Sequence, residues 1–375
     1  MSRLLVISFT DLASDPRVDR QIRCLKSHYQ LIAAGLGPPR HEVDEFIELS
    51  TPDWTPWGQA LWLARLLTRR FDDAFWKQRT NTEALDKLRR VGAEVVVANE
   101  LTALPIALKL GAPVVFDAHE YAPREFDHRA RWRLIVGPYA RWQCRRYIPQ
   151  TAGMMTVGNA IAAEYGREIG VRPVPVTNAP PREDLQPTAV HEPIRVLHHG
   201  GATRGRGLED MIRVARMLDE RFVTTFVLVD VVAGYRDELI RLAEDDPRIR
   251  FLPPQPMHAL ALMANDHDIG MYLLRPANFN QRFALPNKFF EFIQGRLAVA
   301  IGPSPEMARI VNQYGLGVVA DDFAPETLAR KLNSVDGSAI AGFKRASHAA
   351  ADELCAERNE ELILQVVEGA LAASR

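Results

Sequence analysis

The sequence predicts an α/β fold made of two doubly wound, parallel-sheet domains, and three observations support this. The 375 residues are too many for one hydrophobic core and enough for two domains of ordinary size. In both halves, short apolar runs alternate with segments of helical periodicity, which is typical of parallel sheets covered by helices. Between the halves, residues 179–193 carry four prolines and almost no apolar periodicity, so we predict an interdomain linker at 181–193.

The first predicted domain covers residues 1–180. Its predicted strands are short apolar runs that end in polar loops. They lie at residues 4–7, 94–98, 113–116 and 154–157. Helices are expected from Pro16, over residues 104–110 and over residues 159–168.

The second predicted domain covers residues 194–350. Its predicted strands lie at residues 194–197, 226–229, 249–252, 269–273 and 298–301. A glycine-rich loop, Gly200 to Gly207, follows the first of these strands, and a helix is expected from Leu208. Residues 351–373 have helical spacing and few breakers, which predicts a last helix.

Charge and cysteine content narrow the function classes. The net charge is −1 with 25% charged residues, so no overall field favours nucleic acid, and we expect no nucleic-acid partner. The cysteines, Cys24, Cys144 and Cys355, are odd in number and far apart, which fits neither a disulfide framework nor a zinc site. No apolar run reaches the length of a membrane span and no signal peptide is visible, so we expect a cytoplasmic protein.

One stretch in the second domain, beginning at Pro286, has the features of a ligand-binding element. Pro286 suits the start of a helix and Gly295 its end, so we predict a short helix between them. The backbone N–H groups and positive dipole end of a helix start suit a phosphate group. Lys288 adds a positive charge, and Glu291, one turn on, can accept two hydrogen bonds from a ribose diol. The alternative is a surface helix whose Lys288 and Glu291 are solvated.

Residues 285–291, Leu-Pro-Asn-Lys-Phe-Phe-Glu, are followed by Gly295, a predicted strand and Pro305-Glu306. This pattern resembles the donor-nucleotide loop of the retaining glycosyltransferases of family four. The resemblance covers essentially the whole chain and implies a GT-B fold, in which two Rossmann-like domains face each other across a cleft. It also implies that a C-terminal helix, residues 352–375, returns to complete the N-terminal domain.

The resemblance implies that the glycine-rich loop binds the diphosphate of a nucleotide sugar. Gly200 and Gly201 would let the backbone approach the phosphates. In related sequences an Arg and a Lys five residues apart clamp the diphosphate; Arg206 takes the place of the Lys, whereas Gly201 takes the place of the Arg. Arg204 is the substitute that the sequence offers for the missing cation. A plain tight turn is the alternative.

On the helix side of this donor site, Asn287 and Lys288 would contact the phosphates and Glu291 would hold the ribose. Family members commonly carry a second Glu eight residues earlier, where Phe283 stands here, so this position does not identify the sugar. Residues 266–268, Asp-His-Asp, have the form of a metal-binding Asp-x-Asp motif, but a predicted strand begins there, so we expect a structural turn. We predict no metal and no cofactor, with the nucleotide sugar as substrate.

The N-terminal domain offers candidates at the carboxyl ends of its strands, where open α/β sheets bind ligands. His119 follows one predicted strand and matches the histidine that faces the donor sugar in family-four enzymes, which makes it the catalytic candidate. It would orient the sugar and stabilise positive charge at the anomeric carbon. Asn99 and Glu100 end the preceding strand, and Asp15 lies in the first loop; these three are candidates for the acceptor side. An isolated histidine is otherwise more often structural.

Two stretches, residues 54–76 and 129–147, mix aromatic and basic side chains. Basic amphipathic helices can lie on an anionic membrane, and family members with lipid-linked acceptors use such surfaces. The alternative is two ordinary helices whose aromatic residues pack on the sheet and whose arginines face water. Peripheral contact with the inner face of the membrane is therefore one of two interpretations.

Together these features predict a glycosyltransferase that moves a sugar from a nucleoside diphosphate to an acceptor hydroxyl with retention of configuration. The acceptor would be a saccharide, a lipid-linked sugar or another glycoconjugate, and the family suggests a role in surface polysaccharide or glycolipid synthesis. Two alternatives remain open. One is a sugar-nucleotide epimerase of GT-B fold, which should carry more carboxylates in its site; the other is a non-catalytic, nucleotide-sugar-binding partner subunit.

Overall fold

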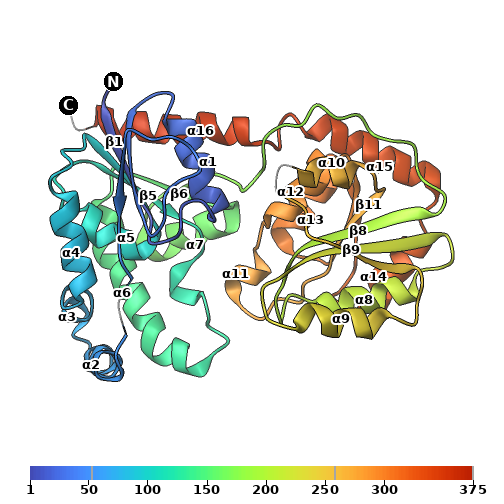
Figure 1. Cartoon of the computed structure of the whole chain (residues 1–375), viewed down its shortest axis with the longest axis horizontal. Helices are drawn as coiled ribbons and strands as arrows, with labels where there is room; N and C mark the ends of the chain where they lie inside the picture. The colour runs from blue at the N-terminus through green and yellow to red at the C-terminus, as the bar shows by residue number, and fades with distance from the viewer. Residues whose placement is uncertain (52–53, 257–258, 374–375) are drawn as a thin grey trace. The chain divides into compact units, whose positions relative to one another are not determined.

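The computed structural model describes residues 1–51, 54–256 and 259–373, and these form two compact units (Figure 1). The first unit contains Met1–Thr177, Asn278–Asn280 and Asn359–Arg375. The second contains Asn178–Ala277 and Gln281–Arg358. Each unit is built on one sheet whose paired strands are all parallel, as the alternation of strands and helices predicted.

The sheet of the first unit has seven strands in the order β3-β2-β1-β4-β5-β6-β7. Their bounds are β1 Arg3–Ile7, β2 Gln30–Gly35, β3 Glu45–Glu48, β4 Val95–Asn99, β5 Val114–Ala118, β6 Gly153–Thr156 and β7 Val174–Pro175. The central strands β4 and β5 are buried at every residue, which explains their continuous apolar runs. Their register pairs Asn99 with Asp117, so the polar ends of the two strands lie side by side.

Helices cover both faces of this sheet. Their bounds are α1 Pro16–Leu25, α2 Pro56–Leu67, α3 Phe71–Trp76, α4 Arg79–Leu88, α5 Glu100–Ala107, α6 Gly137–Tyr147 and α7 Asn159–Ile169, with the short turns η1 Ala122–Arg124, η2 Trp132–Val136 and η3 Ile148–Gln150. Helix α1 begins where predicted, because Pro16 fixes its first turn and Asp15 accepts the N–H groups of Arg17 and Val18.

The last helix, α16 (Ala356–Ala372), contributes its C-terminal part to the first unit. Ile363 and Val367 join the same apolar cluster as Val18 and Ile22 of α1, and Figure 1 shows the two helices side by side. Helix α16 begins at Ala356, after a turn; residues 374–375 of the predicted helix lie outside the described residues.

The sheet of the second unit has six strands in the order β10-β9-β8-β11-β12-β13. Their bounds are β8 Ile194–Ala202, β9 Phe222–Asp230, β10 Ile249–Leu252, β11 Ile269–Tyr272, β12 Ala298–Ile301 and β13 Gly317–Val319. Strand β8 is longer than the predicted 194–197, because β9 pairs with it along its whole length, including Gly200 and Gly201. The expectation of a loop over residues 200–207 is thus wrong for its first three residues.

The helices of the second unit lie between these strands. Their bounds are α8 Leu208–Met217, α9 Tyr235–Ala243, α10 Leu260–Asn265, α11 Phe279–Arg282, α12 Asn287–Gln294, α13 Pro305–Tyr314, α14 Pro325–Asn333 and α15 Gly337–Ala350; α11 begins in the first unit. Strand β11 and helix α12 pack closely, since a Cβ at Gly270 would overlap the Phe292 ring.

The irregular segment 178–193 is held against the second unit by a buried arginine. Arg296 donates to the carbonyls of Glu183 and Leu185 and is 1% exposed. Its backbone has a φ of +62°, whereas the neighbouring Gly295, which the sequence suggested for the helix end, has a φ of −77°. Among the helices that the structure describes, we find none with the length and apolarity needed to cross a membrane.

Candidate functional site

The second unit gathers several sequence-predicted residues at the start of α12. Pro286 is the N-cap, Asn287 the first helical residue and Gly295 the C-cap, so the helix has its predicted bounds. The apolar residues from Phe289 to Ile293 are fully buried, which anchors the helix in the core. No side chain caps its first turn, so this end can bind an anion through backbone N–H groups.

Lys288 lies beside the polar ends of β8 and β11. Its Nζ is 3.5 Å from Nε2 of His198 and 5.0 Å from the ring centroid of Tyr272. Because Nδ1 of His198 lies 2.9 Å from the Met271 carbonyl and donates to it, Nε2 is the atom that accepts from the lysine. Gly200 has a φ of +133°, and a Cβ there would lie 2.7 Å from Nζ. The backbone therefore favours glycine at this position, and any larger residue would also displace the end of the Lys288 side chain.

Burial sets the charge of these groups. It lowers the pKa of Lys288 to about 8, helped by the Arg206 charge and opposed by Glu291. Burial and the Lys288 charge also hold the pKa of His198 well below its usual range and lower that of His199 to about 3. Both imidazoles are neutral at neutral pH, so the positive charge here comes from Lys288 and Arg206.

Glu291 faces the neutral His199. The residue is 8% exposed, and its Oε2 lies 3.4 Å from His199 Nε2. This imidazole nitrogen makes no hydrogen bond within the described residues. The pair therefore brings acceptor oxygens and an unsatisfied ring nitrogen together one helical turn from Lys288, which is chemistry suited to hydroxyl groups.

The two arginines of the glycine-rich turn have different surroundings. Arg206 hydrogen-bonds the Tyr272 side chain and so belongs to the group around the lysine. Arg204 pairs with Glu238 at 2.6 Å, and its guanidinium lies 4.4 Å from the Tyr235 ring centroid. The structure therefore groups Arg206 with Lys288, while Arg204 is engaged by helix α9.

The Asp-x-Asp sequence at residues 266–268 is held by hydrogen bonds from within the unit. Asp268 is fully buried and accepts from the Arg195 N–H at 2.9 Å and from Lys344 Nζ at 2.9 Å. His267 Nδ1 lies 3.0 Å from the Met263 carbonyl. Among the described residues, no three His, Cys, Asp or Glu side chains cluster as metal ligands would. Independence from metal stays a prediction.

The first unit carries His119 directly after β5. Its Nε2 lies 3.0 Å from Asn99 Oδ1, and its backbone N–H donates to Glu100 Oε1 at 2.8 Å. Asn99 in turn donates to the Ile7 carbonyl, which leaves Oδ1 as the atom that faces the imidazole. The three candidates His119, Asn99 and Glu100 thus form one hydrogen-bonded group. Burial lowers the pKa of His119, although the Asp117 charge opposes the shift, so the ring is neutral.

A buried ion pair supports this group from below. Arg17 donates to Asp117 from Nε at 2.7 Å and from Nη2 at 2.6 Å, and to the Val176 carbonyl at 2.7 Å. Asp117 is fully buried, also accepts from Gln21, and lies 3.8 Å from His119 Nε2. The ion pair with Arg17 holds the pKa of Asp117 below its usual range despite burial. It therefore fixes a negative charge beside the imidazole.

Glu100 has an unusual backbone and an unusual proton affinity. Its φ is +65°, in the left-handed region that favours glycine. Burial and the nearby carboxylates of Glu125, Glu120 and Asp117 raise the pKa of Glu100 to about 8, although 36% of the side chain reaches the surface. At neutral pH this carboxyl is mostly protonated. Asp15, the third acceptor-side candidate, instead caps helix α1.

Sequence reasoning missed His198, His199, Tyr272 and Arg17. His198 and His199 directly precede Gly200, so the polar pair at the end of a strand could have drawn attention to them. Tyr272 lies within the predicted strand 269–273 and is the last residue of β11 in the structure. Arg17 gave no signal, because its partner Asp117 lies 100 residues away in the chain.

Comparison with known proteins shows the fold. No family model and no curated sequence matches the chain. Solved structures do match: HepE of Anabaena in complex with UDP-glucose is 12% identical with a TM-score of 0.71, covering 98% of this chain and 100% of that one. An α,α-trehalose-phosphate synthase (UDP-forming) of Burkholderia vietnamiensis is 13% identical with a TM-score of 0.69, covering 100% and 98%. A glycosyltransferase of Rickettsia africae is 11% identical with a TM-score of 0.68, covering 99% and 98%. The chain therefore has the GT-B fold.

Proposed function

We propose that this protein is a retaining glycosyltransferase of the family-four type that transfers a sugar from a nucleoside diphosphate to an acceptor hydroxyl. The observation that carries the proposal is the group formed by Gly200, Arg206, Lys288 and Glu291 at the start of α12. Two cations beside an uncapped helix start suit a diphosphate, and a carboxylate one turn away suits a ribose diol. Similarity in fold to HepE and to the trehalose-phosphate synthase supports UDP as the first nucleotide to test.

The proposed reaction needs no nucleophile from the protein. The bond between the anomeric carbon and the diphosphate oxygen breaks, and the acceptor oxygen bonds to that carbon from the same side. The acceptor proton passes to the departing phosphate oxygen. Lys288 and Arg206 stabilise the negative charge that grows on the diphosphate, and the neutral His119 stabilises the positive charge on the sugar.

A thermal-shift experiment tests the donor site. UDP, GDP, ADP and UDP-glucose are added to the wild type and to the variants Arg206→Ala and Glu291→Ala. A nucleotide at a hundred times its dissociation constant should add about 2.7 kcal/mol of stability, and both variants should lose that gain. Arg213→Ala is the matched control, since Arg213 is an exposed residue of the same unit that pairs with Asp210. Absence of any shift at millimolar nucleotide would reject the proposal.

A second candidate function is a sugar-nucleotide epimerase, and the carboxyl groups near His119 favour it. Burial and the Glu120 charge raise the pKa of Glu125 to about 7, and Glu100 is raised to about 8, so both can exchange protons near neutral pH. Incubation with the nucleotide sugar that gives the largest thermal shift separates the two functions. A transferase releases nucleotide when an acceptor is present, whereas an epimerase forms an isomeric nucleotide sugar without an acceptor.

We also propose that the first unit rests on an anionic membrane, which would suit a lipid-linked acceptor and a role in polysaccharide or glycolipid synthesis. Trp57, Leu61 and Leu67 of α2 are 79%, 51% and 63% exposed, and Leu134 of the neighbouring η2 turn is 73% exposed. Arginines lie along both segments. The double variant Trp57→Ala/Leu134→Ala should lose sedimentation with anionic vesicles. Leu262→Ala, which removes a leucine that is 63% exposed on the second unit, should keep it.

A further inference from the structure

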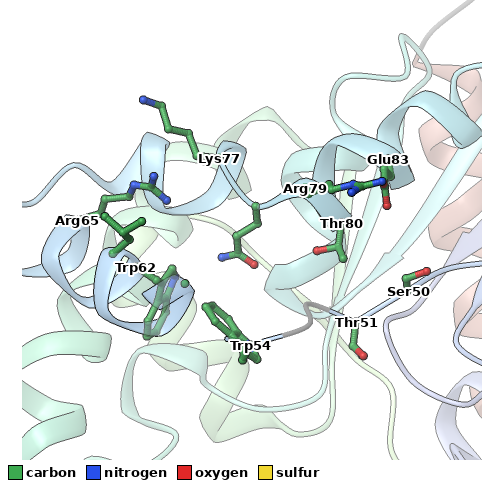
Figure 2. Close-up of a pocket in the computed structure, with 12 residues that line it drawn as sticks. Ser50, Thr51, Trp54, Trp62, Arg65, Lys77, Arg79, Thr80 and Glu83 are labelled. Atoms are coloured by element: carbon green, nitrogen blue, oxygen red, sulfur yellow. The ribbon is translucent and has the colours of Figure 1, made fainter. Parts of the chain in front are cut away.

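A pocket lies in the first unit, away from the group around His119. It has a volume of about 470 Å³, within the range of about 300–1,000 Å³ that is usual for small-molecule sites. Its walls come from the segment after β3, from helix α2 and from the junction of α3 and α4. Figure 2 shows Trp54 and Trp62 near each other on one side of the pocket, with Arg79, Thr80 and Glu83 across from them.

The aromatic wall offers apolar faces together with unsatisfied polar atoms. The ring centroids of Trp54 and Trp62 lie 5.5 Å apart at an interplanar angle of 66°, so the two indoles present differently oriented surfaces. Trp62 Nε1 and Thr80 Oγ1 are shielded from water and make no hydrogen bond within the described residues. A sugar matches this combination, because its C–H faces pack on aromatic rings and its hydroxyls both donate and accept.

The charge of the pocket is positive. Arg65, Lys77 and Arg79 line it, against one carboxylate, Glu83. Glu83 pairs with Arg79, and Lys77 lies 3.8 Å from Asp73. The Arg65 guanidinium forms no ion pair with any residue that the structure describes. A planar, uncommitted guanidinium beside a tryptophan suits a carboxylate or a phosphate.

The pocket shares an edge of the sheet with His119 but lies far along it. Ser50 and Thr51 follow the carboxyl end of β3, and His119 follows the carboxyl end of β5; all strands are parallel, so these ends share one edge. Strands β2, β1 and β4 lie between them. Four steps of about 4.8 Å give a separation of about 19 Å along the edge. A ligand that reaches from one site to the other must be a chain of several sugars.

We infer that this pocket binds an anionic sugar unit, one that carries a carboxylate or a phosphate, within an oligosaccharide acceptor. The bound unit lies several sugars away from the hydroxyl that reacts. Trp62 packs against its ring, and Arg65 binds its anionic group. Small rotations of the Trp62 and Thr80 side chains bring the indole N–H and the threonine hydroxyl, which lack partners within the described residues, to the sugar hydroxyls. The assignment of the ligand as the acceptor rests on the proposed function, whereas the chemistry of the pocket does not.

Saturation-transfer NMR with three monosaccharide probes tests the inference directly. Glucuronate, glucose 6-phosphate and uncharged glucose are compared at equal concentration on the full chain. Glucuronate or glucose 6-phosphate should bind at least tenfold more tightly than glucose, and Arg65→Ala should remove that preference. Arg69→Ala is the charge-matched control, because Arg69 is exposed, lies four residues further on and does not line the pocket.

Variants with conservative changes keep the test independent of folding. Trp62 packs against Tyr139, so its replacement could unfold this region; Arg65→Lys and Thr80→Val retain the size of the side chain. Arg65→Lys should recover part of the preference for the anionic sugars over glucose that Arg65→Ala loses. Thr80→Val should weaken the binding of all three probes alike. Equal binding of glucose and glucuronate, or unchanged binding by Arg65→Ala, would overturn the inference. If anionic lipid vesicles bind the pocket and none of the sugar probes does, the pocket belongs to a lipid headgroup. That result would also overturn the inference.

The nucleotide experiment separates this inference from the proposed function. If UDP and the other nucleotides fail to bind but glucuronate does, the transferase proposal fails and the sugar pocket remains. If a nucleotide binds but the anionic sugars do not, the pocket assignment fails and the donor site remains. Arg65→Ala should leave nucleotide binding unchanged in either case, because Arg65 and the donor group lie in different units.

Discussion

The two units share one topology and carry opposite chemistry at the ends of their strands. In the second unit, the group around Lys288 is cationic: Lys288 and Arg206 meet beside an uncapped helix start, and the neighbouring imidazoles of His198 and His199 are neutral. In the first unit, the group around His119 contains buried or partly buried carboxyls and one neutral imidazole.

This difference follows from what lies beneath each group. Under His119, Arg17 keeps the buried Asp117 ionised. Burial and the carboxylates of Glu125, Glu120 and Asp117 then raise the pKa of Glu100 above it. Around Lys288, Glu291 is the carboxylate that raises the lysine pKa, and burial outweighs it. One parallel-sheet plan therefore carries a cationic group in one unit and, in the other, a group of carboxyls around a neutral imidazole.

The largest effect is expected from the ion pair under His119. Arg17→Ala leaves the fully buried Asp117 without its cation, and loss of one partner of a buried pair costs about 3–5 kcal/mol. Urea unfolding should show this loss. Arg167→Ala, which breaks an exposed pair with Glu164 in the same unit, should leave the unfolding free energy nearly unchanged. Equal stability of the two variants would show that the first unit does not depend on its internal pair.

The next effect concerns the cationic group. Lys288→Ala removes a charged donor and should weaken nucleotide binding by about 1.5–3 kcal/mol, or roughly 10- to 150-fold, in calorimetric titration. Lys331→Ala is the control, since Lys331 lies on the same unit and pairs with Asp321 at the surface. Wild-type affinity in Lys288→Ala would mean that the second unit does not use its positive charge for the donor.

A smaller effect should follow from pH. Because the pKa of Lys288 is about 8, the ammonium loses its proton as the pH rises through that value, and nucleotide affinity should fall by up to about tenfold between pH 7 and pH 9. His198 and His199 stay neutral over this range and contribute no slope. The variant Lys288→Arg supplies the comparison, because an arginine side chain stays charged throughout and the slope should vanish. A slope that persists in this variant would assign the pH dependence to another group.

Much of the fold could be predicted from the sequence, since buried parallel strands leave continuous apolar runs. Strands β10 and β12 have their predicted bounds. Strands β2, β3, β7 and β13 were missed because they are short, contain small residues or lie toward an edge of the sheet, so that little apolar pattern marks them. The length of β8 was missed because its second half carries His198 to Gly201, and only pairing with β9 keeps these residues in a strand.

The grouping of the candidate residues was predictable where they are close in sequence. Asn287, Lys288 and Glu291 occupy one helix, so one motif predicted their neighbourhood. The support for His119 was not predictable, because Arg17 and Asp117 meet only through the order of strands in the sheet. The strained backbone of Glu100 was hidden for a similar reason: nothing in the sequence shows that the chain turns into α5 through a positive φ.

Glu100 gives the smallest expected effect and tests the carboxyl-rich side of the comparison. Its pKa is raised from 4.5 to about 8 by burial, so the folded protein holds this proton more tightly than the unfolded chain does. Below pH 4.5 both the folded and the unfolded state are protonated, and the group has no influence on stability. As the pH rises toward 8, the unfolded chain gains stability by ionising first, and folding is weakened.

Glu100→Gln keeps the shape of the protonated acid and cannot ionise. The variant should therefore melt with the wild type at about pH 4.5 and about 2–4 °C higher at about pH 8, which corresponds to about 1 kcal/mol once the exposure of the side chain is discounted. If the melting temperatures of Glu100→Gln and the wild type instead change in parallel across this range, the carboxyl is ionised in the folded protein. The contrast between the cationic group of the second unit and the group around His119 would then rest on the neutral imidazole of His119 alone.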